Sequence, residues 1–128
     1  MPGKSIFLAE SENHVREALR LLLENQSDFV ITGEADHAES MLAQVCGQLP
    51  DMILLDWDLP GFHPNRMIPT LQRHCPSIQI VAISVKPEHQ KAAIEYGVDA
   101  FLLKQLDPDR FLAALYSVQQ NEIKGTPS

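Results

Sequence analysis

Long apolar runs are missing from this sequence, and we expect no secretory leader. A transmembrane helix needs about 20 consecutive apolar residues, and no segment of the chain reaches that length. The residues before Ser5 lead into a short apolar stretch that lacks the longer hydrophobic region and the small-residue cleavage site of a signal peptide. We therefore expect no membrane association and a cytoplasmic location.

Cysteine and positive charge are also scarce. The two cysteines, Cys46 and Cys75, are far apart, form no CxxC pair and have none of the five histidines at zinc-ligand spacing. We expect both thiols to be reduced and no zinc site. Ten Lys and Arg residues stand against 17 Asp and Glu residues, a formal net charge of −7. A field of that sign repels phosphate backbones, so we expect no direct binding of nucleic acid by this domain.

The length and composition fit one globular domain. A chain of 128 residues, 45% of them hydrophobic, buries roughly two-thirds of its unfolded surface, which is enough for an α/β core. The residues after Ile123 are polar and rich in helix breakers. We predict a domain over residues 1–122 and the start of a linker, or a disordered tail, over residues 123–128.

Short apolar runs alternate with longer segments of helical period, which is the pattern of βαβ units. The predicted strands cover residues 5–9, 29–33, 52–55, 78–83 and 100–103. Most are almost continuously apolar, as strands covered by helices on both faces must be. We predict an α/β fold with a doubly wound, five-stranded parallel sheet in the flavodoxin-like order 2-1-3-4-5.

The segments between the predicted strands carry apolar residues at helical spacing. These stripes consist of Val15, Ala18, Leu19 and Leu22, then Ala38, Met41, Leu42 and Val45, and at the end of the chain Phe111, Leu112, Leu115 and Val118. Two shorter helices follow Pro64 and Pro87, since proline suits the first turn of a helix. Before the last helix, we expect Asp107 to cap the free N–H groups.

Polar residues of different chemistry close the predicted strands. They are Glu10 and Ser11 after the first strand, Asp56 and Asp58 after the third, Ser84 after the fourth and Lys104 after the fifth. Ligands of such sheets bind outside the carboxyl ends of the strands, so we expect these side chains to share one cavity. Clustered carboxylates favour a hard cation such as Mg²⁺, and a hydroxyl and an ammonium group suit phosphoryl oxygens. The pattern predicts a phosphoryl-transfer site.

Four segments that contain these residues resemble bacterial response regulator receiver domains over nearly the whole chain. They are IFLAESENHVREALR (6–20), LLDWDLPG (54–61), VAIS (81–84) and GVDAFLLK (97–104). The resemblance implies a (βα)5 receiver fold with Asp56 as phosphoacceptor and Lys104 as the phosphoryl-binding lysine. It also implies a switch made of Ser84 and Phe101.

The resemblance further implies a Mg²⁺ ion held by Glu10, Asp56 and the backbone carbonyl of Asp58, with Ser11 as an additional candidate ligand. Receivers usually carry two acids after the first strand, and here Ser11 replaces the second one. We expect a lower metal affinity as a result. Ser11 also has an alternative interpretation as the N-cap of the first helix.

The residues directly after Ser84 and Lys104 also differ from the usual receiver sequence. Val85 stands where many receivers have Ala, and Gln105 stands where they often have Pro. We expect Val85 to narrow access to Asp56.

The resemblance implies a phosphorelay protein that receives a phosphoryl group from a sensor histidine kinase and then changes its protein contacts. An output domain or partner protein, and a homodimer, are the further partners it implies. It would catalyse formation and hydrolysis of its own acyl phosphate without being an enzyme for a separate metabolite. The alternative is an atypical receiver with weak metal binding that acts as a phosphorylation-independent interaction module.

Two enzymatic or redox alternatives have weaker support. The Asp56-Trp57-Asp58 segment resembles the DxD nucleophile of haloacid-dehalogenase-like phosphatases, but Leu59 replaces the usual polar residue and the chain has no room for a cap domain. A flavodoxin-like electron carrier would need a Gly- and Thr-rich phosphate loop after the first strand, which is missing.

The single tryptophan and the histidines are not expected to take part in the chemistry of the site. We expect Trp57 to form a partly exposed ring over the site. We expect all five histidines to be surface residues without a catalytic role. These are His14, His37, His63, His74 and His89.

Overall fold

The computed structural model describes residues 3–120 as five strands and five helices in alternation. The elements are β1 (Lys4–Ala9), α1 (Asn13–Glu24), β2 (Phe29–Ala35), α2 (Ala38–Gln48), β3 (Met52–Asp56), α3 (Pro64–His74), β4 (Gln79–Ser84), α4 (His89–Glu95), β5 (Ala100–Leu103) and α5 (Pro108–Gln120). All strand pairs are parallel, and the order is β2-β1-β3-β4-β5. The predicted α/β fold and strand order are confirmed.

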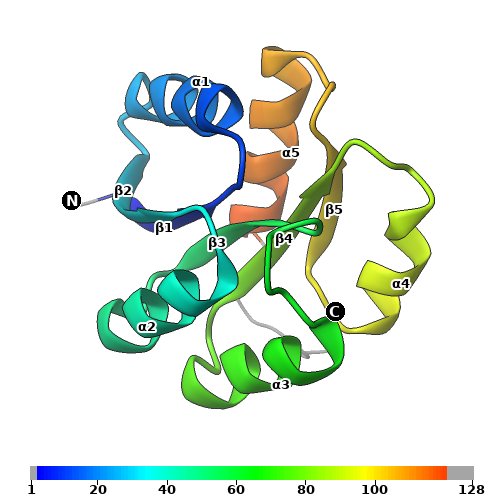
Figure 1. Ribbon diagram of the computed structural model, residues 1–128. Helices are drawn as coiled ribbons and strands as arrows, with labels where there is room; N and C mark the ends of the chain where they lie inside the picture. Colours follow the sequence, from blue (N-terminus) through cyan, green and yellow to red (C-terminus); the bar gives the residue numbers. More distant parts are fainter. Residues whose placement is uncertain (1–2, 121–128) are drawn as a thin grey trace.

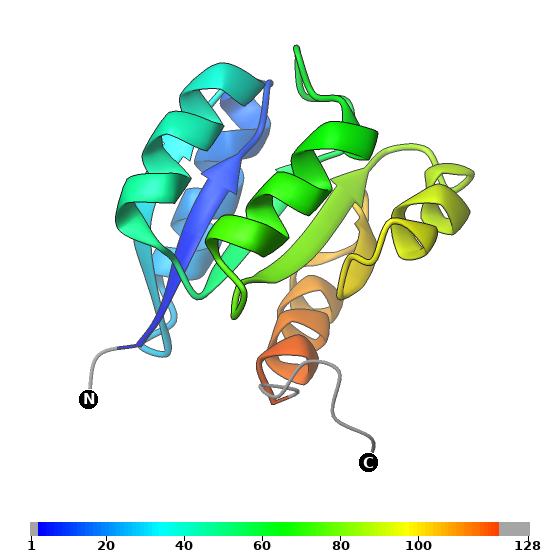
Figure 2. The same ribbon diagram turned by 90° about the horizontal axis from the view of Figure 1, so that it is seen from below.

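Helices cover both faces of the sheet (Figure 1). Helices α1 and α5 pack on one face, where Leu23 and Leu115 are fully buried with Leu54 of β3. Helices α2, α3 and α4 pack on the other face, where α2 and α3 lie side by side (Figure 2). Successive residues of a strand point to opposite faces, so each central strand contributes to both cores. This arrangement explains why β3 and β4 are buried along their whole length.

Helices α1, α2 and α5 follow their predicted stripes with one exception. In α1, Ala18 is exposed and Leu23, which the stripe omitted, is fully buried. Leu23 lies four residues after Leu19, so it extends the same face toward the end of the helix. At the start of α5, Arg110 N donates to Asp107 Oδ1 at 3.0 Å, which confirms the predicted cap.

The edge strand β2 extends two residues beyond its predicted end, to Ala35. Its pairing with β1 contains an irregularity between Ile6 and Phe7. Opposite this point, a Cβ atom on Gly33 would lie 2.7 Å from Phe7 Cε2, closer than side chains normally approach. Gly33 therefore provides the space that the Phe7 ring occupies beside β2.

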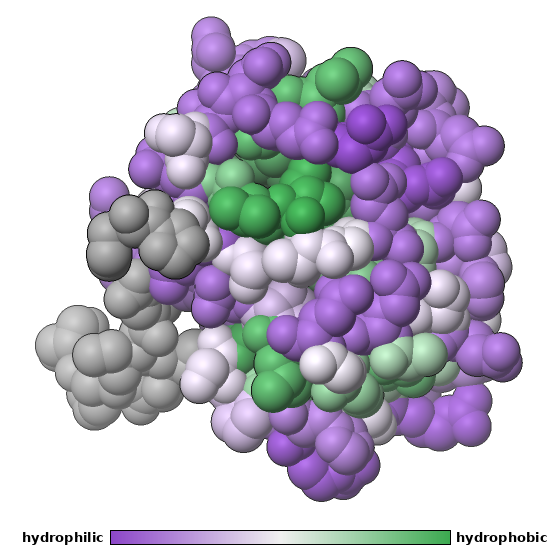
Figure 3. Space-filling model, turned by 90° about the vertical axis from the view of Figure 1, so that its left-hand side faces the viewer, coloured by the Kyte–Doolittle hydropathy of each residue, from purple (hydrophilic) through white to green (hydrophobic). Residues whose placement is uncertain are grey.

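Figure 3 shows the side of the molecule that carries α1, β2 and α2. This side is mostly hydrophilic, with hydrophobic surface gathered near its centre, and Leu21 and Val30 are among the exposed apolar side chains of these elements. Within residues 3–120, no helix is long and apolar enough to span a bilayer. Cys46 and Cys75 are both free thiols, as predicted. The predicted tail, residues 123–128, lies outside the described residues.

Candidate functional site

Asp56 is the last residue of β3, and its side chain is fully buried at the carboxyl end of the sheet. Both carboxylate oxygens accept hydrogen bonds. Oδ1 accepts one from Asp58 N at 2.9 Å and lies 3.2 Å from Lys104 Nζ. Oδ2 accepts one from Ser11 Oγ at 2.8 Å and one from Ser11 N at 3.3 Å. These donors hold the carboxylate in one orientation.

Lys104 bridges two buried carboxylates from distant parts of the chain. Its Nζ lies 2.9 Å from Glu10 Oε1, donates to Glu10 Oε2 at 3.0 Å and contacts Asp56 as described above. The Lys104 side chain is 9% exposed, and the Glu10 side chain is 1% exposed. The parallel order of β1, β3 and β5 brings the three strand ends to one edge, as the sequence predicted.

The two ends of this ion pair have pKa values shifted by opposing effects. Burial raises the pKa of Glu10, and the hydrogen bonds from Glu12 N and Lys104 offset only part of that rise. Burial lowers the pKa of Lys104, but its hydrogen bond to Glu10 and the charge of Asp56 outweigh burial and leave the pKa raised. Lys104 therefore remains an ammonium ion, with two carboxylates competing for its charge.

The oxygen atoms around Asp56 and Glu10 are of the type that binds a hard cation, although the total negative charge of this group is low. Among the described residues, Glu10 Oε1 is buried without a hydrogen-bond partner, and it lies 2.9 Å from the Lys104 ammonium group. Carboxylate, hydroxyl and carbonyl oxygens are the ligands that Mg²⁺ prefers. Within residues 3–120, however, no three acidic, His or Cys side chains converge on one point. Ser11 explains this, because a neutral hydroxyl stands beside Asp56 where another carboxylate would complete the cluster.

Ser84 is fully buried at the end of β4, between β3, which ends at Asp56, and β5, which Lys104 follows. Asp56 is paired with Ile83, and Lys104 N donates to Ser84 O at 2.9 Å. The Ser84 Oγ atom accepts a hydrogen bond from Lys86 N at 3.0 Å and lies 2.9 Å from His89 Nδ1. The sequence predicted the position of Ser84 at this edge but did not predict its imidazole partner.

Phe101 and the two atypical residues lie around this edge. Phe101 of β5 is half-buried and packs against the core beneath α2, α3 and α4. Gln105 Nε2 donates to Val85 O at 3.1 Å, and the Val85 side chain is 50% exposed. The atypical residues thus connect the loop after β4 to the loop after β5.

Three sequence-based interpretations need correction. Ser11 is not the helix cap, because α1 begins at Asn13 with Glu12 before it, and the Ser11 hydroxyl binds Asp56 instead. Trp57 is 9% exposed and packs edge-on against Phe62, with ring centroids 5.2 Å apart. Its ring is therefore part of the core rather than an exposed cover over the site.

The third correction concerns His89, the first residue of α4. Four of the five histidines are exposed, but the His89 side chain is only 25% exposed and contacts Ser84. A signal for this contact was present in the sequence. Pro87 places the start of a helix directly after the fourth strand, so the first turn of that helix must lie near the strand end.

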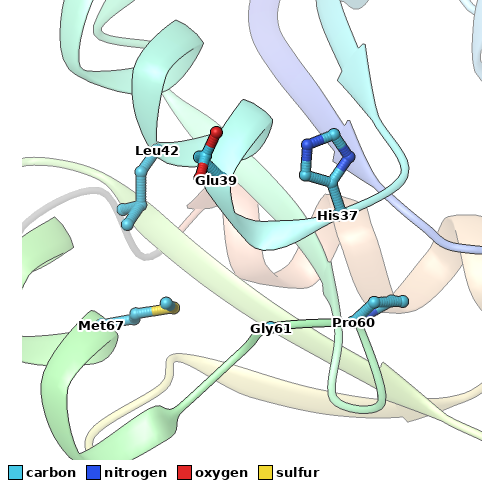
Figure 4. A pocket seen from close by; sticks show the side chains of 6 residues that line it. All are labelled: His37, Glu39, Leu42, Pro60, Gly61 and Met67. Carbon is cyan, nitrogen blue, oxygen red and sulfur yellow. The ribbon is translucent and has the colours of Figure 1, made fainter.

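An apolar groove of about 540 Å³ lies between α2, α3 and the loop after β3, away from Asp56. Figure 4 shows Leu42 of α2 and Met67 of α3 on opposite sides of it, with Pro60 and Gly61 on the loop. Asp56, Ser84 and Lys104 do not line it. The groove is therefore separate from the polar site.

Comparison with solved structures places the fold among receiver domains. The signal receiver domain of the response regulator NarL from Mycobacterium tuberculosis matches with a TM-score of 0.85 and 21% identity over 94% of this chain and 99% of that chain. The isolated receiver domain of RcsB from Salmonella enterica serovar Typhimurium matches with a TM-score of 0.83 and 21% identity, over 98% of this chain and 94% of that chain. At these identities the likeness shows the shared fold.

Comparison with protein sequences shows the family. The nitrate/nitrite response regulator NarL of Escherichia coli is 28% identical over 121 residues, which are 93% of this chain and 56% of NarL. The phosphate regulon transcriptional regulatory protein PhoB of Pseudomonas aeruginosa is 30% identical over 122 residues, 92% of this chain and 52% of PhoB. The chain thus spans about half the length of these relatives. A family model described as response regulator receiver domain matches residues 6–116, and the chain therefore belongs to the response regulator receiver domain family.

Proposed function

We propose that Asp56 accepts a phosphoryl group from a sensor histidine kinase and that the domain then changes its protein contacts. The observation that carries this proposal is the position of the Asp56 carboxylate. It is buried, accepts hydrogen bonds from three donor groups and lies 3.2 Å from the Lys104 ammonium. A carboxylate beside a fixed ammonium group suits nucleophilic attack on phosphorus.

In the proposed transfer, one Asp56 oxygen forms a bond to phosphorus while the P–N bond of the donor phosphohistidine breaks. The donor ring takes a proton from solvent on the nitrogen that is not bonded to phosphorus, so that it leaves as neutral imidazole. Lys104 stabilises the charge on the transferred phosphoryl oxygens. Glu10 and Asp58 would hold Mg²⁺ together with Asp56, through two carboxylates and the Asp58 carbonyl, with Ser11 as an additional oxygen ligand. When bound, the ion adds positive charge next to the phosphoryl group.

The proposed response to phosphorylation runs through β4 and β5. The Ser84 hydroxyl turns to a phosphoryl oxygen, and the half-buried Phe101 ring changes its packing. The surface near β5 then differs between the two states, and a partner that binds one state more tightly shifts the population toward it. The domain would form and hydrolyse its own acyl phosphate and would not turn over a separate metabolite.

We propose an output domain or a separate effector protein as the downstream partner, and a homodimer as a further assembly. The support is that the relatives are about twice as long and that PhoB is called a transcriptional regulatory protein. A cytoplasmic location follows from a kinase donor of this type. With a net charge of −7, we propose that this domain does not itself contact nucleic acid.

The test is labelling with acetyl phosphate in the presence and absence of Mg²⁺, followed by intact-mass analysis. The matched control is Asp56→Asn, which keeps the shape of the side chain and removes the nucleophile. We expect one phosphoryl adduct in the wild type and none in the variant. Equal labelling of both proteins would contradict the proposal, and an absence of labelling in both would favour the phosphorylation-independent interaction module.

A further inference from the structure

The hydrogen bond between Ser84 and His89 determines which way the Ser84 hydroxyl points. Lys86 N–H can only donate, so Ser84 Oγ is the acceptor in that contact at 3.0 Å. The hydroxyl hydrogen then needs an acceptor of its own, because Ser84 is fully buried and buried donors are almost always paired. His89 Nδ1, at 2.9 Å, is the partner that can accept it. In this arrangement Nδ1 of His89 is the acceptor, and the ring hydrogen lies on Nε2.

We propose that His89 is a positioning residue that holds the Ser84 hydroxyl away from the phosphoryl site until Asp56 is phosphorylated. The inference rests on the proposed function, since it concerns regulation of the same site. A hydroxyl has one hydrogen to donate. A phosphoryl oxygen on Asp56 must therefore take that hydrogen from His89 Nδ1, and His89 opposes the phosphorylated state by the free energy of this bond.

The same bond connects the site to α4. His89 is the first residue of this short helix, which lies beside β5 at the edge of the molecule (Figure 1). When the Ser84 hydroxyl no longer donates to His89 Nδ1, the first turn of α4 loses this contact with the end of β4. The imidazole tolerates this release because it is already 25% exposed and can bind water.

The charged groups around His89 do not replace Ser84 as a partner. Asp58 Oδ2 lies 4.0 Å from His89 Nδ1, beyond hydrogen-bond distance, and the Asp58 side chain is 45% exposed. Lys86, Glu88 and Lys91, the charged residues next to it along the chain, are all exposed. Among the described residues, Ser84 is thus the direct hydrogen-bond partner of this imidazole.

Trp57 provides a natural reporter for α4. It is the single tryptophan of the chain, and its ring centroid lies 6.2 Å from that of Tyr96, the residue that follows α4. A movement of α4 relative to β3 changes this ring contact. The fluorescence of Trp57 should therefore report the release of the helix.

The experiment compares wild type, His89→Ala and His89→Asn in a titration with beryllofluoride, a phosphoryl mimic, followed by Trp57 fluorescence. His89→Ala removes the competing acceptor, so we expect tighter binding by about fivefold, the factor that corresponds to one neutral hydrogen bond. His89→Asn supplies an amide oxygen near the place of Nδ1 and should restore wild-type affinity. His14→Ala is the surface control, because the His14 side chain is 80% exposed.

Long-range ¹H–¹⁵N NMR of the unliganded protein tests the tautomer separately. We expect hydrogen on Nε2 and none on Nδ1; a proton on Nδ1 would overturn the inference. Equal beryllofluoride affinity in wild type and His89→Ala would also overturn it while leaving the phosphoacceptor proposal intact. If the wild type binds no beryllofluoride, the phosphoacceptor proposal fails, and the competition at Ser84 fails with it.

Discussion

Replacement of Lys104 by Met tests whether the buried ion-pair network stabilises the fold. The variant keeps the aliphatic stem but removes the ammonium that lies within 3.2 Å of both Glu10 and Asp56. Both carboxylates are fully buried, so the variant leaves two like charges without a counterion. Removing one partner of a buried pair costs about 3–5 kcal/mol of unfolding free energy, and we expect a loss in that range at pH 7.

The pH dependence of this loss follows from the pKa of Glu10. Burial already raises that pKa above its ordinary value of 4.5, and the variant removes the lowering effect of Lys104. An acid whose pKa is higher in the folded state costs no stability below its unfolded pKa and destabilises progressively as pH rises through the folded value. The difference between variant and wild type should therefore shrink as pH falls toward 4.5.

The wild type should lose stability in alkaline solution, where Lys104 gives up its proton. Although burial opposes it, pairing with Glu10 and Asp56 raises the pKa of Lys104 above its ordinary value of 10.5. A base with a raised pKa contributes its full stabilisation below the unfolded value and loses it as pH rises through the folded value. This alkaline loss should be absent from Lys104→Met.

Urea denaturation followed by circular dichroism measures these effects at several pH values. The double variant Glu10→Gln, Lys104→Met removes one of the two unpaired carboxylates and should recover most of the lost stability at pH 7. Lys91→Met is the control at an exposed lysine of α4 and should change stability by less than about 0.5 kcal/mol. A loss below about 1 kcal/mol in Lys104→Met, independent of pH, would contradict a stabilising role for the buried network, because that is the size of a surface ion pair.

Two further substitutions test the metal site and the sheet. Ser11→Asp places a second carboxylate beside Asp56 and should increase Mg²⁺ affinity by at least about tenfold in a calorimetric titration, since it adds a full charge near the ion; unchanged affinity would contradict the assigned donor set. Gly33→Ala places a Cβ 2.7 Å from Phe7 and should cost about 1–3 kcal/mol in urea denaturation. Gly47→Ala, in α2 with open space around it, should instead stabilise by about 0.5–1 kcal/mol, and equal effects of the two glycine variants would refute the steric argument.

The fold was predictable because its signals are local and repeated. Apolar runs that suit strands alternate with stripes of helical period, and polar residues follow the strands at corresponding points. Parallel order then requires Glu10, Asp56, Ser84 and Lys104 to lie at one edge of the sheet, and the structure has them there. Boundaries were less accurate at β2, because an edge strand alternates exposed and buried residues that resemble a loop.

Tertiary structure decided the partners of the side chains at that edge. The Ser11 hydroxyl could cap α1 or bind Asp56, and the approach of β1 to β3 selected Asp56. Trp57 was buried by Phe62 of the same loop and by Tyr96, which follows α4. His89 met Ser84 because α4 begins beside the end of β4. The groups that reach the site were predictable, since the hydrophobic period and the polar residue after each strand are local patterns. Hydrogen-bond partners and ring packing were not predictable, because they depend on distances between side chains that come together only in the folded protein.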